Sequence, residues 1–334
     1  MKDRRLGKNG ARVSPIGIGA MSFTDFYGRA NDEESHQVLD AALDLGINHI
    51  DTSNIYGNGR SESVIGSYLQ KQGAQKNSLF KIASKVGICK DEKTGGRYFN
   101  NSEKHIKDEL HKTLARLGLD SLELYYIHRR DTSIPIEEVT ETMQSLVQDG
   151  KIQSFGFSEI SPSSLRRAQV ISHVAAVQSE YSLSTRSTEL GLNQLTEESG
   201  TALVAFSPVG RSLLTDSPHS PETSRKLDFL KENPRFNDIN LPKNLKIVQT
   251  YRELASDLNL SAAGLAIAWL LHQGENIIPI PGTRSVKHLE EFVTGANRSL
   301  TSEEIAQVER VLPVGWAHGD RYSENQWQAV ERYC

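Results

Sequence analysis

Eight short runs of apolar, β-favouring residues recur along the chain, and they limit its fold more than any other feature. The runs span residues 14–19, 47–51, 79–84, 122–127, 154–157, 175–178, 202–206 and 277–280. Between them lie segments whose apolar residues recur at helical spacing, for example 33–45, 102–117 and 136–148. Strands and helices are therefore expected to alternate.

Glycines support this alternation. Gly46, Gly118 and Gly150 each follow a helical segment and precede the next apolar run by a few residues, as residues at helix C-termini do. Alternating strands and helices imply parallel strands joined by right-handed crossovers, in a doubly wound open sheet or in a closed barrel. The count of eight favours the α/β class and a (β/α)8 TIM barrel.

The chain is longer than such a barrel requires. It has 334 residues, whereas a typical barrel of this type has about 250. The additional residues lie in a long, proline-rich and polar loop after the seventh strand, 207–241, and in an aromatic-bearing tail, 315–334. Since no internal repeat or low-complexity segment interrupts the pattern, we predict one domain over residues 1–334.

Composition excludes several classes of function. The net charge of −4 and the pI near 6.2 give no sign of a nucleic-acid-binding surface. The longest apolar run, 262–271, has about half of the roughly 20 residues that a membrane span needs, and the N-terminus lacks the apolar core of a signal peptide. Cys89 and Cys334 are too few for a disulfide framework, so we expect a reducing, cytoplasmic location. The sequence does not predict an oligomeric state.

Polar residues cluster at the predicted carboxyl ends of three consecutive strands. Asp51 ends the second strand, Lys85 ends the third and His128 ends the fourth, while Tyr56 lies in the loop after Asp51. In a TIM barrel these ends face one mouth, where catalytic residues lie. Each residue alone is more often structural, as a cap, a strand end or a packing group, but four of them at one barrel end indicate a site.

These four groups have complementary chemistry. The ordinary pKa of tyrosine is near 10, and a neighbouring Lys85 is expected to lower it. Asp51 would keep Lys85 charged and oriented, and His128 could hydrogen-bond the phenol or a substrate oxygen. A proton donor of this kind suits the reduction of a carbonyl, whose oxygen must be protonated as hydride arrives.

Seven motifs extend this hypothesis, because they occur in an order and at a spacing that resemble the aldo-keto reductases. They are IDTSNIYGNGRSE, KIASK, YYIHRRD, GKIQSFGFSE, AVQSEYS, VAFSPVGR and IIPIPGTRSVKHLEE. The resemblance implies a barrel that binds extended NADPH. The sequence has no H-E-x-x-H motif, so we expect no catalytic metal. The resemblance also implies that Tyr56 is the catalytic acid or base, that Lys85 and Asp51 set its pKa, and that His128 orients the carbonyl.

The resemblance also assigns cofactor residues, with some departures. Ser158 and Gln178 match residues that hold the nicotinamide carboxamide, whereas Glu159 replaces the commoner asparagine and cannot donate to a carbonyl while ionised. Phe206 replaces the tyrosine that stacks on the nicotinamide. The full predicted set is Gly19, Ala20, Met21, Ser158, Glu159, Gln178, Phe206, Ser207, Val209, Arg211, Gly282, Thr283, Arg284, Lys287, His288 and Glu291.

The far end of this set resembles a phosphate site. Gly282, Thr283 and Arg284 precede a helix that is expected to begin near Ser285, and backbone N–H groups at a helix start bind anions. Arg284 and Lys287 are expected to pair with the 2′-phosphate of NADPH, which favours NADP over NAD. His288 and Phe292 stand where the family often has arginine and asparagine.

The leading hypothesis is therefore an NADPH-dependent reductase of an aldehyde or ketone, with Tyr56 as proton donor. Phe26, Tyr27 and Trp316 are the predicted substrate-binding residues, in the loop after the first strand and in the tail. The sequence does not identify the small-molecule substrate. Two alternatives remain: a nucleotide-sensing regulatory subunit with slow turnover, like the potassium-channel β-subunits that share this barrel, and a binding barrel without cofactor.

Overall fold

All eight strands of the main sheet run parallel. The computed structural model describes residues 1–91 and 93–333, so Cys334 lies outside the described residues. The sheet has the order β12-β11-β10-β9-β8-β5-β4-β3. Its strands are β3 (Ile18–Gly19), β4 (His49–Asp51), β5 (Lys81–Val86), β8 (Leu122–Ile127), β9 (Ile152–Ser158), β10 (Ala176–Glu180), β11 (Ala202–Phe206) and β12 (Ile277–Pro279).

Backbone hydrogen bonds join the two outer strands of this order. The N–H of Gly17 donates to the carbonyl of Pro279 at 2.9 Å, and the N–H of Gly19 donates to that of Pro281 at 3.0 Å. The first strand therefore lies beside the last, and the sheet closes on itself. The predicted (β/α)8 barrel is confirmed, and a doubly wound open sheet is excluded.

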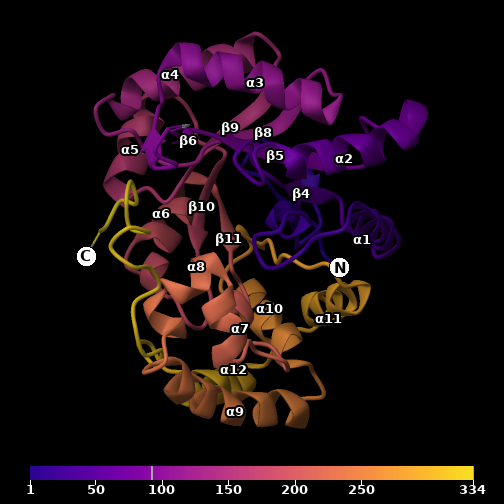
Figure 1. The fold of residues 1–334 in the computed structure, drawn as a ribbon, viewed down its shortest axis with the longest axis vertical. Coiled ribbons are helices and arrows are strands. Elements are labelled where there is room, and N and C mark those ends of the chain that lie inside the picture. Colours follow the sequence, from indigo (N-terminus) through magenta and orange to yellow (C-terminus); the bar gives the residue numbers. More distant parts are fainter. Residues whose placement is uncertain (92, 334) are drawn as a thin grey trace.

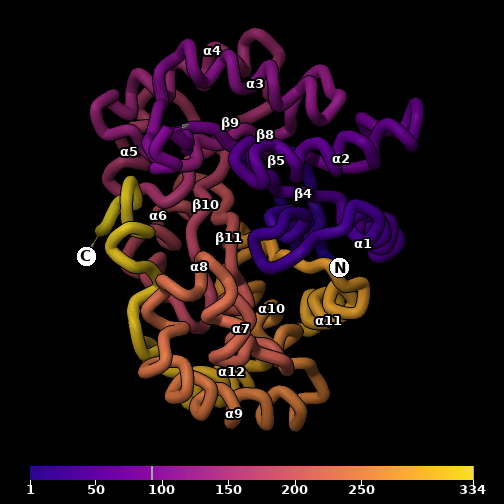
Figure 2. The backbone as a smooth tube through the Cα atoms, in the orientation of Figure 1, coloured from indigo at the N-terminus to yellow at the C-terminus, as the bar shows by residue number. Residues whose placement is uncertain are grey.

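Helices surround the strands, as Figures 1 and 2 show. They are α1 (Asp32–Asp44), α2 (Arg60–Lys71), α3 (Glu103–Leu117), α4 (Ile136–Gln148), α5 (Pro162–Ile171), α6 (Leu192–Ser199), α7 (Pro221–Lys226), α8 (Asp228–Lys231), α9 (Leu241–Asp257), α10 (Ala262–His272), α11 (Val286–Ala296) and α12 (Ser302–Val311). All eight predicted strand runs overlap observed strands, and the three predicted helical segments match α1, α3 and α4 to within one residue at each end.

Local sequence signals account for these boundaries. Ser102 caps α3 by accepting a hydrogen bond from the N–H of His105, and Gly118 ends the helix in the left-handed conformation (φ 66°). At the start of α11, Ser285 accepts from the N–H of His288 in the same way. The predicted helix start near Ser285 is confirmed.

Two hairpins lie outside the eight-strand pattern. Strands β1 (Arg4–Arg5) and β2 (Arg12–Val13) pair antiparallel, and Leu6 and Val13 pack with the inward-facing residues of the barrel. This first hairpin therefore closes the N-terminal end of the barrel. Strands β6 (Ile88–Lys90) and β7 (Arg97–Phe99) form the second, after β5. Strands of two or three residues are too short to show periodicity in the sequence.

The segment 207–241 is more regular than the predicted loop. It holds α7, α8 and the 3₁₀ turns Gly210–Ser212 and Pro234–Phe236. Leu213, Leu230, Phe236 and Leu241 form a separate small apolar cluster, which gives the segment a core of its own. Expecting one long loop was wrong because its polar composition hid four short helical pieces.

In the described residues, no single helix has the length and hydropathy of a membrane span. Helices α9 and α10 meet those limits only when taken together, across a bend of 83°.

Helices α10 and α11 cross at two glycines, which gives a stability prediction. A Cβ on Gly295 would lie 2.1 Å from the carbonyl oxygen of Gly264, whereas a Cβ on Gly264 would meet its nearest neighbour at 3.1 Å. We expect Gly295→Ala to lower the free energy of unfolding by about 1–3 kcal/mol through overpacking. Gly264→Ala is the matched control, because the gain in helix propensity of about 1 kcal/mol offsets its milder crowding. Equal unfolding free energies in urea would contradict this.

Candidate active site

The four predicted catalytic side chains meet at the carboxyl ends of neighbouring strands. Asp51 is the last residue of β4, Lys85 lies near the end of β5, and His128 directly follows β8. Tyr56 lies in the turn between β4 and α2. The side chains of Lys85 and Asp51 are 0% and 2% exposed, so a lysine and an aspartate share the interior of the barrel mouth.

Lys85 is held by three acceptors. Its ammonium forms an ion pair with Oδ1 of Asp51, donates to the carbonyl of Thr52 at 2.8 Å and donates to Oη of Tyr56 at 3.3 Å. These contacts use all three N–H bonds of the ammonium. Burial lowers the pKa of Lys85. The charges and hydrogen bonds of Asp51 and Tyr56 together raise the pKa by more than burial lowers it, so the net shift is upward.

Asp51 is fixed by a second donor. The side-chain amide of Gln178, on β10, donates to Oδ2 of Asp51 at 2.7 Å. Both carboxylate oxygens are therefore bonded, as a buried charge requires. The predicted contact of Gln178 with a nicotinamide carboxamide remains a prediction, and in this structure its amide nitrogen binds Asp51.

His128 lies beside Tyr56 and is neutral. The two ring centroids are 5.8 Å apart with an edge-to-face angle of 82°, and Nδ1 of His128 is 3.2 Å from Oγ of Ser53. Burial, and then the positive charges of Arg129, Lys85 and Arg97, hold the pKa of His128 well below 6.5. Ser53 is a contact that the sequence motifs did not point out.

The pKa of Tyr56 differs from the prediction. Burial raises it above 10, and this exceeds the lowering by Lys85. The expected net lowering is therefore wrong, because the same enclosure that brings Lys85 close also removes the water that would solvate a phenolate. Tyr56 consequently holds its proton at neutral pH.

The predicted cofactor residues occupy three parts of the mouth. Gly19 ends β3, and Ala20 and Met21 begin the 3₁₀ turn Ala20–Phe23. Oγ of Ser22 in this turn donates to the carbonyl of Thr283 at 2.9 Å. A Cβ on Gly282 would lie 2.9 Å from the carbonyl oxygen of Gly19, so the ends of the first and eighth strands are in contact.

In the predicted phosphate site, one of the two expected cations is already bonded to the protein. The guanidinium of Arg284 donates to the carbonyls of Gly28, Arg29 and Tyr27 at 2.6, 2.7 and 3.0 Å, which ties it to the loop after β3. Lys287 and His288 are exposed in the first turn of α11, and Glu291 is partly buried one turn later.

A left-handed segment follows β11. Phe206 is partly exposed at its end, and Ser207, Gly210, Arg211 and Ser212 have φ of 51°, 58°, 53° and 84°. Val209, between them, is partly buried. Turns of this kind gather backbone N–H groups into concavities that bind anions.

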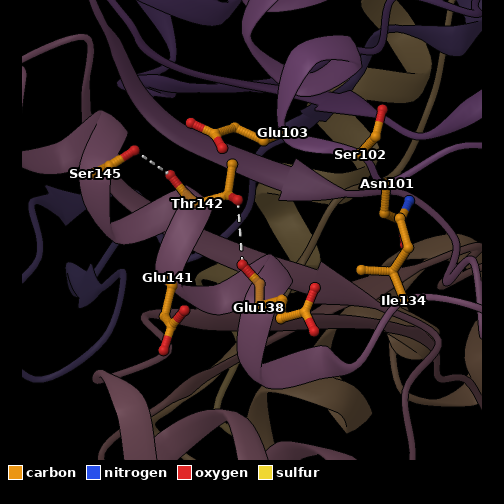
Figure 3. A pocket seen from close by; sticks show the side chains of 8 residues that line it. All are labelled: Asn101, Ser102, Glu103, Ile134, Glu138, Glu141, Thr142 and Ser145. Carbon is orange, nitrogen blue, oxygen red and sulfur yellow. Dashed lines mark hydrogen bonds between the residues drawn. The ribbon is translucent and has the colours of Figure 1, made fainter.

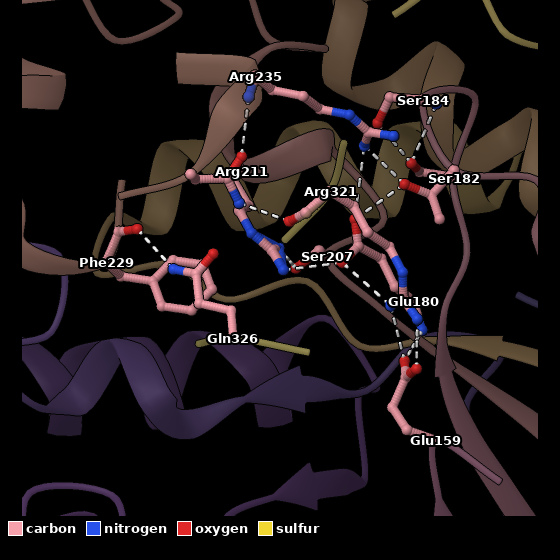
Figure 4. A network of polar contacts seen from close by, with 12 residues as sticks. Glu159, Glu180, Ser182, Ser184, Ser207, Arg211, Phe229, Arg235, Arg321 and Gln326 are labelled. Atoms are coloured by element: carbon pink, nitrogen blue, oxygen red, sulfur yellow. Dashed lines mark hydrogen bonds and ion pairs between the residues drawn. The ribbon is translucent and has the colours of Figure 1, made fainter. Parts of the chain in front are cut away.

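Glu159 has a different partner from the predicted one. Its carboxylate accepts from both terminal nitrogens of Arg321 in the C-terminal tail, at 3.0 and 2.5 Å, and its backbone φ is 56° (Figure 4). Burial raises the pKa of Glu159, but the charge and hydrogen bonds of Arg321 outweigh this, so the pKa is lowered. These contacts make Glu159 an anchor for the tail, and its predicted contact with the cofactor remains a prediction.

The carboxylate of Glu180 lies close to three arginines, beside the Glu159–Arg321 pair (Figure 4). Oε2 of Glu180 lies 2.8 Å from Nη2 of Arg211 and 3.6 Å from Arg321, while Oε1 lies 3.7 Å from Arg235. Arg211, predicted to bind cofactor, is thus paired with a buried carboxylate. The network joins β9, β10, the segment after β11 and the tail.

The predicted substrate residues separate into two places. The ring of Phe26 packs on Tyr27 and Phe229, with centroids 4.9 and 5.2 Å away, and burial raises the pKa of Tyr27 to about 12. The charges of Tyr56, Glu180, Arg211 and Tyr322 also act on the hydroxyl of Tyr27, so this hydroxyl lies near the mouth.

Trp316, the third predicted substrate residue, packs in the main core. Its indole N–H donates to the carbonyl of Leu183 at 2.7 Å, as in a packing residue.

A surface hollow elsewhere is not part of this site. It encloses about 500 Å³ between α3 and α4 and is lined by Asn101, Ser102, Glu103, Ile134, Glu138, Glu141, Thr142 and Ser145 (Figure 3). None of the four catalytic candidates lines it.

Among the described residues, no group of histidine, cysteine or acidic side chains could hold a metal ion.

The Glu159–Arg321 pair gives a second prediction. Since both side chains are buried, we expect Arg321→Met and Glu159→Gln each to lower the free energy of unfolding by about 3 kcal/mol, by leaving a charge without its partner. The double variant should lose less than the sum of the two. Arg225→Met, which breaks an exposed pair with Asp238, should cost less than about 1 kcal/mol. Strict additivity in urea unfolding would show that the pair does not stabilise the tail.

Curated relatives match almost the whole chain. The aldo-keto reductase yakc of Schizosaccharomyces pombe, whose name specifies NADP(+), is 35% identical over 322 residues, which are 96% of this chain and 94% of that protein. The aldo-keto reductase str7 of Strobilurus tenacellus is 36% identical over 327 residues, which are 95% of this chain and 94% of that protein.

Solved structures and a family model agree with these relatives. A glycerol dehydrogenase from Gluconobacter oxydans superimposes with a TM-score of 0.81 and 27% identity over 93% of this chain and 94% of its own. An aldo-keto reductase from Bacillus halodurans, in its holo form, superimposes with a TM-score of 0.78 and 25% identity. The match covers 98% of this chain and 99% of that one. The model of the aldo/keto reductase family matches residues 15–313. The chain belongs to the aldo/keto reductase family.

Proposed function

We propose that this protein is an NADPH-dependent reductase that converts an aldehyde or ketone to an alcohol. One observation supports this most strongly: a protonated tyrosine, Tyr56, receives a hydrogen bond from a buried lysine at the mouth of the barrel, beside a neutral histidine. The arrangement combines a proton donor with polar groups that can hold a carbonyl oxygen.

The residues divide the work of protonation. Tyr56 donates its proton to the carbonyl oxygen as negative charge develops there, and the adjacent ammonium of Lys85 stabilises the phenolate that remains. Asp51 keeps that ammonium charged and in place. Oγ of Ser53 lies 3.2 Å from Nδ1 of His128. We assign the neutral tautomer in which Nδ1 accepts from this hydroxyl, so that the N–H of Nε2 can hydrogen-bond the carbonyl oxygen and orient it.

The residues around the mouth fit an extended dinucleotide. Polar groups at the ends of β9 and β10, Ser158 and Gln178, suit the carboxamide, and the partly exposed ring of Phe206 suits the nicotinamide face. The left-handed segment 207–212 offers N–H groups to phosphates, and exposed Lys287 at the start of α11 suits a further phosphate. NADPH bound there supplies the hydride. The name of the fission-yeast relative, which specifies NADP(+), supports this choice of cofactor.

Removing the Tyr56 hydroxyl tests the proposal directly. We expect Tyr56→Phe to lower the steady-state rate of NADPH oxidation, with a panel of aldehydes and ketones, by about 10²- to 10⁴-fold, because a positioned general acid contributes that much. The matched control is Tyr68→Phe, which removes a hydroxyl bonded to Asp40 on the outer helices at 2.6 Å and should leave the rate unchanged.

The opposite result has a clear meaning. If the wild-type protein and Tyr56→Phe are equally slow on every carbonyl compound, while NADPH still quenches tryptophan fluorescence, the nucleotide-sensing alternative is favoured. If NADPH causes no quenching, the chain is a binding barrel that does not use this cofactor.

The raised pKa of Tyr56 predicts the pH dependence of reduction. Because the phenol stays protonated beyond its ordinary range and His128 stays neutral, the single-turnover reduction rate should be flat from about pH 6 to about pH 9. Oxidation of the alcohol needs the phenolate, so its rate should rise with pH over the same interval. A reduction rate that falls with an apparent pKa near 8 would refute the raised pKa.

A further inference from the structure

Arg129 is a mouth residue that the proposed proton chemistry does not use. It follows His128 directly, and its Nη1 donates to the carbonyl of His128 at 2.7 Å and to Oγ of Ser158 at 3.0 Å. The guanidinium therefore bridges the ends of β8 and β9. This places a positive charge next to the histidine whose ring contacts Tyr56.

Arg97 brings a second guanidinium toward the same place. It lies on β7 of the second hairpin, and its Nη2 donates to the carbonyl of Asn325 in the C-terminal tail at 2.9 Å. The charges of Arg97 and Arg129 both lower the pKa of His128, and the pKa of Arg97 is itself lowered by burial and then by Arg129. The two like charges therefore oppose each other, with Arg97 on the exposed side of the mouth.

These two arginines differ from the other cations of the mouth. Lys85 pairs with Asp51, Arg211 with Glu180, and Arg321 with Glu159. In residues 1–91 and 93–333, no carboxylate lies within 4.0 Å of a terminal nitrogen of Arg129 or Arg97. Glu232 acts on Arg97 only from beyond that distance. Among the residues that the structure describes, neither guanidinium therefore has a carboxylate within ion-pair distance, although the charge of Glu159 acts on Arg129 from farther away.

We propose that the carbonyl substrate carries an oxyanion, a carboxylate or a phosphate, which pairs with Arg129 and is further stabilised by Arg97. The inference rests on the proposed reductase function. Arginine offers several N–H donors in a planar fork that matches such oxyanions. Within the described part of the chain, both hydrogen bonds of the Arg129 guanidinium come from Nη1, which leaves Nε and Nη2 for an anion. An anion bound there would lie beside His128 and would offset the repulsion between the two arginines.

Matched substrate pairs test this charge preference. The first pair is 4-carboxybenzaldehyde and 4-nitrobenzaldehyde, which have similar shape but differ in charge. The second is glyceraldehyde 3-phosphate and glyceraldehyde, which separates phosphate from carboxylate recognition. For each pair the measured quantity is the ratio of kcat/KM for the anionic compound to that for the neutral one, at low and at high salt.

We expect the wild-type ratio to exceed one for at least one pair, and Arg129→Met to lower that ratio roughly 10- to 100-fold, mainly through KM, as loss of hydrogen bonds to a charged group does. Arg129→Lys, which keeps the charge but loses the planar fork, should give an intermediate ratio and guards against a fold defect in the methionine variant. Arg167→Met is the control for net charge, because Arg167 is exposed on α5 and pairs with Glu137.

The outcomes separate this inference from the proposed function. If the wild-type protein oxidises NADPH with none of the four aldehydes, anionic or neutral, the proposed reductase function is wrong and this inference is wrong with it. If it reduces both kinds with no preference for the anion, only the inference is overturned. It is also overturned if Arg129→Met lowers kcat/KM equally for both members of a pair and weakens NADPH binding, since Arg129 would then serve the cofactor.

Discussion

The buried ion pair between Lys85 and Asp51 is the interaction on which the site depends. Moving two charges out of water costs several kcal/mol for each ion, and their attraction offsets this only when every remaining polar atom is bonded. Here the other carboxylate oxygen accepts from Gln178, and the ammonium also reaches Thr52 and Tyr56. The pair thereby links β4, β5 and β10 across the barrel interior.

This enclosure determines how Tyr56 functions. The environment that strengthens the Lys85–Asp51 attraction also penalises a phenolate, and burial outweighs the lysine in setting the pKa. The tyrosine is therefore protonated in the resting protein, as the proposed role of proton donor requires. In the proposed reaction the charge of Lys85 acts mainly when the proton leaves, because only then is there a negative oxygen for the ammonium to stabilise.

Much of the fold was predictable because its signals are local and repeated. Runs such as 122–127 and 202–206 are apolar along their whole length, as strands of a parallel sheet covered by helices are. The convergence of Asp51, Lys85 and His128 followed from topology, since parallel strands in a barrel bring their carboxyl ends to one mouth.

The features that were missed depend on contacts between distant parts of the chain. The partner of Glu159 is Arg321, 162 positions away, and no local pattern links them. The short hairpin β1–β2 is defined by its packing under the barrel, where Leu6 and Val13 contact inward-facing residues. The direction of the Tyr56 pKa shift was also beyond the sequence, because it depends on how completely the mouth excludes water.

The tail contacts suggest why a glutamate at position 159 is compatible with this site. An ionised glutamate cannot donate a hydrogen bond to a carboxamide carbonyl, so it is a poor replacement for asparagine in holding nicotinamide. Its bidentate contact with Arg321 instead fastens the tail to the end of β9, and the backbone N–H of Glu331 donates to the carbonyl of Glu159 at 3.0 Å. Glu159 and Glu180 are both paired to other arginines, and no carboxylate of residues 1–91 and 93–333 forms an ion pair with Arg129. The same ion pairs that hold the tail over the barrel thus leave the guanidinium of Arg129 available for the anion that we propose.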